Sequence, residues 1–165
     1  MKDLSTMLAP KSVAIIGASN KPSSVGNELI KRIIEAKFKG KIYPINLHEE
    51  TIEGIKCYPN VAAVKAKIDL AIVAVPASIV LNILQECNEI GTKNAIIISS
   101  GFSETGANSM GAKLENQIKE YTEAVEAACE SYAAVNGSAS SKTVQDLKDA
   151  GYLKKDLKKP DGATI

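Results

Sequence analysis

Four short apolar runs without polar alternation mark the predicted strands. They are rich in Val, Ile and Ala, and they span Ser12–Gly17, Lys41–Asn46, Leu70–Val75 and Ala95–Ser99. A continuous β-branched run of this length is typical of a strand buried on both faces, as in a parallel sheet covered by helices. The pattern therefore predicts four strands of one parallel sheet.

Two amphipathic helices are expected between these strands, over Val25–Ala36 and over Ser78–Ile90. Apolar positions recur there at steps of three and four residues. The predicted buried faces hold Val25, Leu29, Ile33 and Ile34 in the first helix, and Ile79, Ile83, Leu84 and Cys87 in the second. Strand, helix and strand at this spacing form a βαβ unit, so we predict an α/β fold with a doubly wound parallel sheet.

The remaining segments have weaker patterns. Thr51–Ala66 predicts a short extra strand and a turn of helix, and apolar steps from Met110 to Tyr132 predict one helix of about 25 residues. Beyond a flexible stretch at Gly137–Ser141, Lys142–Ala150 predicts a short amphipathic helix. The charged, apolar-poor segment Lys154–Gly162 is expected to fray.

Composition excludes several classes of partner. Twenty Lys and Arg against nineteen Asp and Glu leave a formal charge of +1, so no bulk field attracts nucleic acid or an anionic membrane. The longest apolar stretch, Leu70–Val75, stops at Pro76 and is far too short to span a membrane. We therefore expect neither nucleic acid nor membrane as a partner.

The cysteines favour a reducing compartment. Cys57, Cys87 and Cys129 lie far apart, form no CxxC pair and have only His48 to join them, which is too few ligands for structural zinc. An odd count argues against a disulfide framework. We expect inert thiols, no metal and a cytoplasmic location.

A glycine-containing loop after the first predicted strand is the main candidate for binding. The strand turns at Gly17, and the next helix opens near Val25-Gly26. Glycine permits the tight turn, and the exposed N–H groups and positive helix end favour a phosphate. The candidate residues are Gly17, Ala18, Ser19, Asn20, Lys21, Ser23, Ser24 and Val25. A plain connection between strand and helix is the alternative.

Other strand ends contribute candidates because ligands in open α/β sheets bind outside the carboxyl ends of the strands. Asn46 follows the second predicted strand, Val75-Pro76-Ala77 the third, and Ser99-Ser100-Gly101 the fourth. Pro76 lacks an N–H and can pack against a flat or apolar surface, whereas the Ser-Gly segment offers hydroxyls and open backbone. Each segment alone is also compatible with an ordinary turn.

The loop lacks the dinucleotide fingerprint. Gly17 is followed by Gly26 rather than by G-x-G-x-x-G spacing, and the second strand ends in Asn46 instead of the acidic residue that would hold an NAD ribose. Glu49 and Glu50 come slightly too late. NAD(H) binding is therefore the second hypothesis, and a structural module that assembles through the long helix is the third.

Six segments of the chain together carry a family resemblance. The chain closely resembles the N-terminal CoA-binding domain of the ADP-forming acyl-CoA synthetases, which are relatives of the succinyl-CoA synthetase alpha subunit. The resemblance covers about residues 1–119 and is carried by the segments LAPKSVAIIGAS (8–19), SVG (24–26), GKIYPIN (40–46), GIKCYP (54–59), DLAIVAVPA (69–77) and IISSGF (97–102).

This resemblance implies a Rossmann-like domain that binds coenzyme A along the strand ends, with the phosphates near Gly17 to Ser24. In that family the full enzyme forms an acyl phosphate, passes phosphate through a histidine of another domain and uses an ATP-grasp domain for the nucleotide. Neither additional domain fits in 165 residues. The resemblance implies that this chain is part of an acid–thiol ligase and needs partner domains or subunits. Homo-oligomerisation is left open. Ser23 stands where the family often has glycine.

The tail departs from this family. Instead of a further strand and a Gly-Pro-Asn-Cys segment, residues 124–137 and 144–153 resemble the part of type IV pilins and pseudopilins that follows their membrane helix. We therefore divide the chain into a CoA-binding domain, 1–119, and a helical extension, 120–165. A fused or truncated reading frame and a divergent pair of helices are both open interpretations of the extension.

Overall fold

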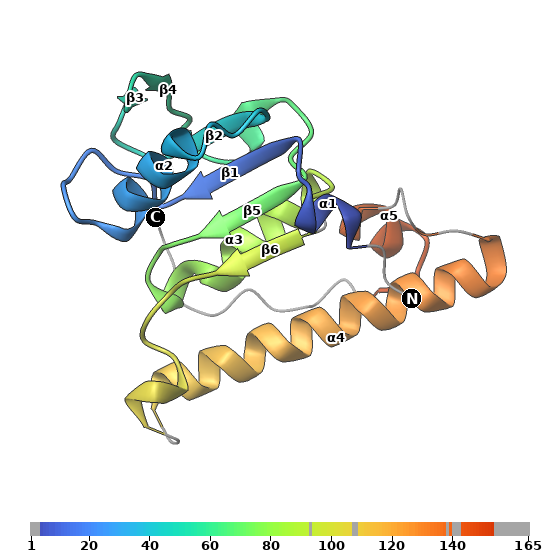
Figure 1. Ribbon diagram of the computed structural model, residues 1–165. Helices are drawn as coiled ribbons and strands as arrows, with labels where there is room; N and C mark the ends of the chain where they lie inside the picture. Colours follow the sequence, from blue (N-terminus) through green and yellow to red (C-terminus); the bar gives the residue numbers. More distant parts are fainter. Residues whose placement is uncertain (1–3, 93, 107–108, 138, 140–142, 154–165) are drawn as a thin grey trace. The chain divides into compact units, whose positions relative to one another are not determined.

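A four-stranded parallel sheet forms from the apolar runs (Figure 1). Its strands lie in the order β2-β1-β5-β6, with bounds β1 Ser12–Ile16, β2 Lys41–Ile45, β5 Leu70–Val73 and β6 Asn94–Ile97. Every neighbouring pair is parallel. The predicted Rossmann-like α/β fold is confirmed, and β6 begins one residue earlier than the sequence pattern indicates.

The computed structural model describes residues 4–92, 94–106, 109–137, 139 and 143–153. They form two compact units, one from Met1–Val75 and Thr92–Ser99, the other from Pro76–Gly91 and Ser100–Ile165. The expectation of fraying at Lys154–Gly162 lies outside the described residues, as does most of the stretch Gly137–Ser141. The division of the chain at residues 119 and 120 stays a prediction.

The first unit contains the sheet and its smaller elements. These are α1 Ser5–Leu8, α2 Val25–Glu35, β3 Thr51–Ile52, β4 Ile55–Lys56 and the 3₁₀ turn η1 Ala62–Val64. β3 and β4 pair as an antiparallel hairpin. The hairpin and η1 confirm the extra strand and the turn of helix expected for this region. Its core lies between the sheet and α2 and is formed by Val13, Ile15, Ala18, Ile30, Ile52, Cys57 and Leu70.

The buried face of α2 matches the predicted one only in part, because Leu29 and Ile33 pack against the core as expected but Val25 and Ile34 do not. Ile30 is fully buried at the centre of that face, whereas Val25 is 51% and Ile34 is 42% exposed. At 100° per residue, Val25 lies about 140° around the helix from Ile30. Gly26 and Asn27 occupy the buried face instead, and a hydrophobicity pattern does not count them.

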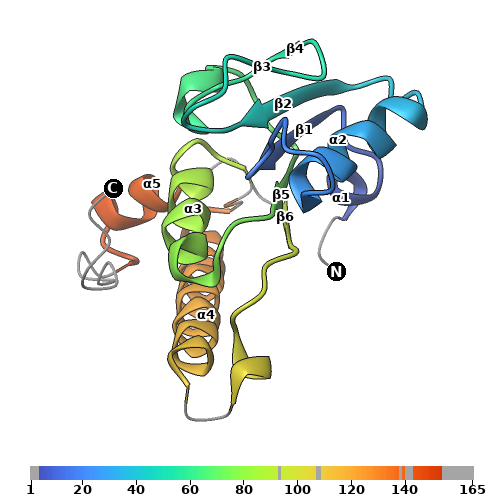
Figure 2. The ribbon, with the colours of Figure 1, turned by 90° about the vertical axis from the view of Figure 1, so that its left-hand side faces the viewer.

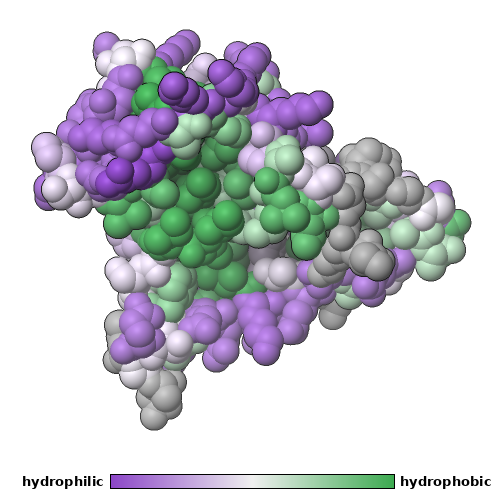
Figure 3. Space-filling view, in the orientation of Figure 1, coloured by the Kyte–Doolittle hydropathy of each residue, from purple (hydrophilic) through white to green (hydrophobic). Residues whose placement is uncertain are grey.

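The sheet leaves apolar side chains visible over β5 and β6 (Figure 3). Ile72 and Ile96 are only partly buried where they pack on the core. Ile97 at the end of β6 and Ile98 after it remain 37% and 45% exposed. In the described chain, β6 pairs on one side only, so it is an edge strand of this sheet.

The second unit is helical (Figure 2). It contains α3 Ala77–Glu89, the 3₁₀ turn η2 Ser103–Thr105, α4 Met110–Asn136 and α5 Val144–Asp149, and both α3 and α5 contact α4. Asn88 of α3 donates a hydrogen bond to the buried hydroxyl of Tyr121 at 3.0 Å. No helix in the described part of the chain is long and apolar enough to cross a membrane.

The predicted face of α3 is also partly wrong. Its buried side chains are Ala77, Val80, Leu81 and Cys87, so only Cys87 was assigned correctly. The apolar residues of α3 form one broad face, so its hydrophobic pattern does not determine which of them are fully buried. At the far end of α4, Ala128 packs with Val144, Leu147 and Leu153 in a small separate core.

Ile30 tests the corrected face of α2. Replacing Ile30 by Ala should lower the free energy of unfolding by about 2–4 kcal/mol, because the change leaves a cavity in a filled core. The matched substitution Ile34→Ala on the same helix should change it by less than about 1 kcal/mol. Urea denaturation followed by circular dichroism measures both. Equal losses would contradict the assignment.

Asp69 generates a second prediction at the amino edge of the sheet. Its Oδ2 accepts from the Lys11 N–H at 2.9 Å, and Lys67 Nζ lies 3.4 Å from Oδ1. Burial alone raises the pKa of the carboxyl. The hydrogen bonds from Lys11 and Lys67 and the charge of Lys67 outweigh burial and hold the pKa below its usual value.

A carboxyl with a lowered folded-state pKa stabilises the fold above the ordinary carboxyl range, and this stabilisation is lost as the pH falls below about 4. Asp69→Asn should therefore be less stable than the wild type at pH 7, and the difference should shrink towards pH 2. Urea unfolding across this pH range measures it. Glu120→Gln, at an exposed site, provides the control, and a constant difference for Asp69→Asn would contradict the role.

Candidate functional site

The carboxyl ends of the strands converge at one edge of the first unit. The Gly17 N–H donates to the Ile45 carbonyl at 3.1 Å, and the Ala74 N–H donates to the Ile16 carbonyl at 2.8 Å. The Ile98 N–H likewise donates to the Val73 carbonyl at 2.8 Å. These contacts join the four strand ends, so the segments that begin at Gly17, Asn46, Ala74 and Ile98 leave the sheet at the same edge.

Gly17 forms the sharp turn that ends β1. Its φ is +90°, in the left-handed region that favours glycine, and a Cβ there would overlap the backbone carbonyl of Ala74. Gly26, near the start of α2, is packed just as tightly, because its Cβ would overlap the carbonyl of Gly17. The helix start is therefore held directly against the turn.

This turn leaves several backbone donors without an acceptor. Lys21 N–H bonds Ser19 Oγ, Ser24 N–H bonds the Lys21 carbonyl, and Asn27 N–H bonds Ser24 Oγ. The other N–H groups have no acceptor within the described residues, and they belong to Ala18, Ser19, Asn20, Ser23, Val25 and Gly26. N–H groups in a turn and at a helix N-terminus favour an anion.

Two asparagine side chains hold the carbonyls of the same loop. Asn46 Nδ2 donates to the Ala18 carbonyl at 2.7 Å, and Asn27 Nδ2 donates to the Ser19 carbonyl at 3.0 Å. Asn46 Oδ1 in turn accepts from the His48 N–H at 2.8 Å. Both ends of the Asn46 amide are thus engaged by the protein. Contact between Asn46 and a ligand stays a prediction, and the sequence analysis missed Asn27.

Two carboxylates support the loop, Glu49 just before β3 and Glu53 in the turn between β3 and β4. Glu49 Oε2 accepts from Asn20 Nδ2 at 2.6 Å, and Asn20 Nδ2 also contacts the Thr51 carbonyl at 2.8 Å. Glu53 Oε1 accepts from Asn27 Nδ2 at 3.2 Å and lies 3.8 Å from Lys31 Nζ. Amide and ammonium groups therefore engage both carboxylates, and the loop N–H groups are left for a ligand.

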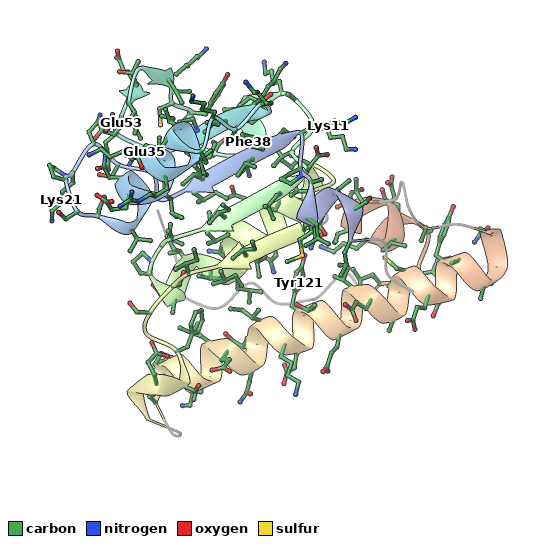
Figure 4. All side chains as sticks on the ribbon, viewed as in Figure 1. Lys11, Lys21, Glu35, Phe38, Glu53 and Tyr121 are labelled. Atoms are coloured by element: carbon green, nitrogen blue, oxygen red, sulfur yellow. The ribbon has the colours of Figure 1, made fainter. Side chains whose placement is uncertain are left out.

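The predicted polar side chains of the loop divide into two kinds. Ser24 caps α2, and its hydroxyl proton goes to the Lys21 carbonyl at 2.9 Å, so this hydroxyl is structural. The hydroxyl protons of Ser19 and Ser23 have no acceptor in the described part of the chain. The side chain of Lys21 is exposed and extends from the loop (Figure 4). Ser23 adopts φ +61°, the conformation expected of the glycine it replaces.

The other candidates fall at or beyond the sheet edge. Val75 packs beside Gly17 in the first unit, and Ser99 lies two residues after β6. The second unit contains Pro76, Ala77, Ser100 and Gly101, and a Cβ at Gly101 would sit 3.6 Å from that of Ala77. The sequence pattern thus places these residues at strand ends, and their role in binding stays a prediction.

The backbone at Gly101 is less open than expected. The N–H groups of Gly101 and Phe102 donate to the two carboxylate oxygens of Glu104, and the Ser103 N–H donates to Glu115 at 3.2 Å. The Gly101 N–H, the backbone of Glu104 itself and the Phe102 N–H hold the pKa of Glu104 below its usual value. This loop therefore already binds two carboxylates of its own chain.

The cysteines take no part in the candidate site. Cys57 and Cys87 are free and buried, and Cys129 is half-buried. Burial raises the pKa of Cys57, and it raises the pKa of Cys87 to about 12. Because the thiolate is the reactive form, these two thiols are poor nucleophiles near neutral pH.

Comparison with known proteins identifies the family. Residues 11–151 match the model of the CoA binding domain family. The chain is 50% identical over 111 residues to an ADP-forming acetate–CoA ligase of Methanocaldococcus jannaschii, covering 67% of this chain and 15% of that protein. It is 42% identical over 118 residues to ADP-forming acetate–CoA ligase II of Archaeoglobus fulgidus, covering 72% and 17%.

A solved structure agrees with these matches. The acetyl-coenzyme A synthetase 1 of Candidatus Korarchaeum cryptofilum, in complex with phosphate and ADP, superposes with a TM-score of 0.66 at 38% identity. The match covers 72% of this chain and 25% of that one. The fold and its glycine-turn loop thus define a nucleotide-binding α/β domain of the Rossmann type. More particularly, the chain belongs to the CoA binding domain family, and it spans about one-sixth of the two curated ligases.

Gly26 tests how tightly the loop is built. Alanine normally stabilises a helix relative to glycine by about 1 kcal/mol, yet Gly26→Ala should destabilise this protein, because the added methyl overlaps the Gly17 carbonyl. We expect a loss of at least about 2 kcal/mol in urea unfolding. Val25→Ala, at the exposed neighbouring position, is the control. A stability gain for Gly26→Ala would contradict the close packing.

Proposed function

We propose that this chain binds coenzyme A, with the phosphates of the ligand at the loop Gly17–Ser24. The observation that carries the proposal is the set of loop N–H groups that have no acceptor within the described residues. These groups lie at the carboxyl edge of the sheet, in a chain that belongs to the CoA binding domain family. Donors that are already fixed in position bind an anion without first paying the cost of ordering the loop. Lys21 adds a positive charge at its tip.

The wider role follows from the relatives. These relatives are ADP-forming acetate–CoA ligases, and one from Pyrococcus furiosus is a subunit alpha. We propose that this chain is the CoA-binding part of such an acid–thiol ligase, working with ATP-grasp and phosphohistidine domains or subunits. It is not catalytically complete alone. The tail's resemblance to pilins and self-association through α4 both stay predictions.

NAD(H) is the competing ligand on this fold. The residue after β2 is Asn46, whose amide is engaged with Ala18 and His48, and the nearby Glu49 carboxylate is hydrogen-bonded to Asn20. The position that holds a ribose in NAD-binding domains therefore lacks an acidic residue here. This arrangement supports CoA over NAD(H). The free thiols of Cys57 and Cys87 support a cytoplasmic location as part of the same proposal.

Isothermal titration with CoA and with NADH tests the proposal. CoA should bind more tightly than NADH, and Lys21→Glu should weaken CoA binding by about tenfold or more, because it places a negative charge beside the phosphates. Lys41→Glu is the matched control, since it makes the same charge change at the opposite edge of the sheet, where β2 begins. Gly17 is unsuitable as a probe because any side chain there disturbs the fold.

A preference for NADH would overturn the proposal. Equal effects of Lys21→Glu and Lys41→Glu would place the phosphates elsewhere.

A further inference from the structure

Two asparagines beside the glycine turn have a role that the sequence did not indicate. Asn27 is 1% exposed in the first turn of α2, and Asn46 is partly buried after β2. Neither side chain is placed to be a principal ligand for a phosphate. Asn27 is too deeply buried, and both atoms of the Asn46 amide are already used.

The geometry of the peptide bond shows what these contacts do. In a trans peptide, the carbonyl of one residue and the N–H of the next point in opposite directions, and no described peptide bond is cis. Asn46 holds the Ala18 carbonyl, so the Ser19 N–H points away from Asn46. Asn27 holds the Ser19 carbonyl, so the Asn20 N–H points away from Asn27.

We propose that Asn27 and Asn46 are positioning residues that orient the Ser19 and Asn20 N–H groups into a cradle for a phosphoryl group. This inference rests on the proposed phosphate site and adds which donors form it and what fixes them. Both N–H groups lack an acceptor in the described part of the chain.

Neighbouring contacts make this arrangement rigid. The Asn27 side-chain amide also donates a hydrogen bond to Glu53, and Glu53 forms an ion pair with Lys31. Asn20 is tied to Glu49 and to the Thr51 carbonyl. The Oδ1 atom of Asn27 is buried without a donor in the described structure, a cost that the protein bears in keeping this side chain between the helix and the loop.

The two asparagines make separable predictions. Asn46→Ala releases the Ala18 carbonyl and should disturb the Ser19 N–H most, whereas Asn27→Ala releases the Ser19 carbonyl and should disturb the Asn20 N–H most. Each substitution should weaken CoA binding by about tenfold or more, because a hydrogen bond to a charged phosphate is among the stronger kinds. A general loss of stability would not produce this residue-by-residue pattern.

Asn94 provides the matched control. Its Nδ2 also donates to a backbone carbonyl, that of Asp69 at 3.1 Å, but at the amino end of β6 and so at the opposite edge of the sheet. Asn94→Ala removes the same kind of hydrogen bond and should leave CoA affinity unchanged. Urea unfolding of the three variants compares their stabilities independently of binding.

The experiment is a titration of the full chain, labelled with ¹⁵N, with CoA and separately with inorganic pyrophosphate, followed by the amide resonances. In the wild type, Ser19 and Asn20 should show the largest downfield proton shifts with both ligands. Asn46→Ala should abolish mainly the Ser19 shift, and Asn27→Ala mainly the Asn20 shift. If Asn27→Ala does not fold, Asn46→Ala decides the question, because Asn46 is outside the core.

Each outcome has a defined meaning. Pyrophosphate shifts at Ser19 and Asn20 without CoA binding would overturn the proposed function and leave the cradle standing. CoA binding with undiminished affinity in Asn46→Ala, or with no response at Ser19 and Asn20, would overturn the cradle and leave CoA binding standing. If neither ligand shifts any amide resonance, both the proposed function and the cradle are overturned.

Discussion

One steric constraint shapes the whole candidate site: no side chain fits at the end of β1. The Ala74 carbonyl closes the space beside Gly17, and Gly17 itself closes the space beside Gly26. Strand β5, the turn and helix α2 are consequently packed backbone against backbone. This close approach brings a helix N-terminus to the sheet edge with its Val25 and Gly26 N–H groups open, and the proposed binding of an anion by the loop depends on it.

Much of the fold was predictable because it depends on local patterns. The four strands needed only uninterrupted β-branched runs, and α4 needed only a regular apolar step over many turns. The phase of each helix was not predictable in the same way. For α2, Gly26 and Asn27 occupy buried positions that hydrophobicity does not mark, and for α3 the apolar face is broader than the part that is fully buried.

The candidate site shows the same division. Glycine spacing located the loop, since Gly17 and Gly26 leave a visible trace in the sequence. The support that Asn46 gives to the Ala18 carbonyl was not foreseen, because a polar residue at a strand end has the same sequence signature whether it contacts a ligand or supports a neighbouring carbonyl. Asn27 was missed because its partners, Ser19 and Glu53, lie 8 and 26 residues away, and no spacing rule connects them.

The Ser-Gly-Phe loop after β6 illustrates how backbone donors can be satisfied internally. Glu104 and Glu115 supply carboxylates to three successive N–H groups, and Gly111 in α4 packs against the carbonyls of Gly101 and Phe102. The backbone N–H groups of the two loops therefore differ in whether the protein itself supplies their acceptors. Near Gly17 the protein secures the carbonyls and leaves the N–H groups open, whereas near Gly101 it secures the N–H groups.

The mutual closeness of Gly17 and Gly26 also restricts how such a domain can diverge. Drift at either position is blocked by neighbouring main chain, so new ligand preferences must arise from the outward-facing residues 19–21 and 23. Ser23 shows that this part of the turn accepts a side chain, since it holds a left-handed conformation without being glycine. Substitutions in this loop can therefore change the chemical groups that it presents far more readily than the path of its backbone.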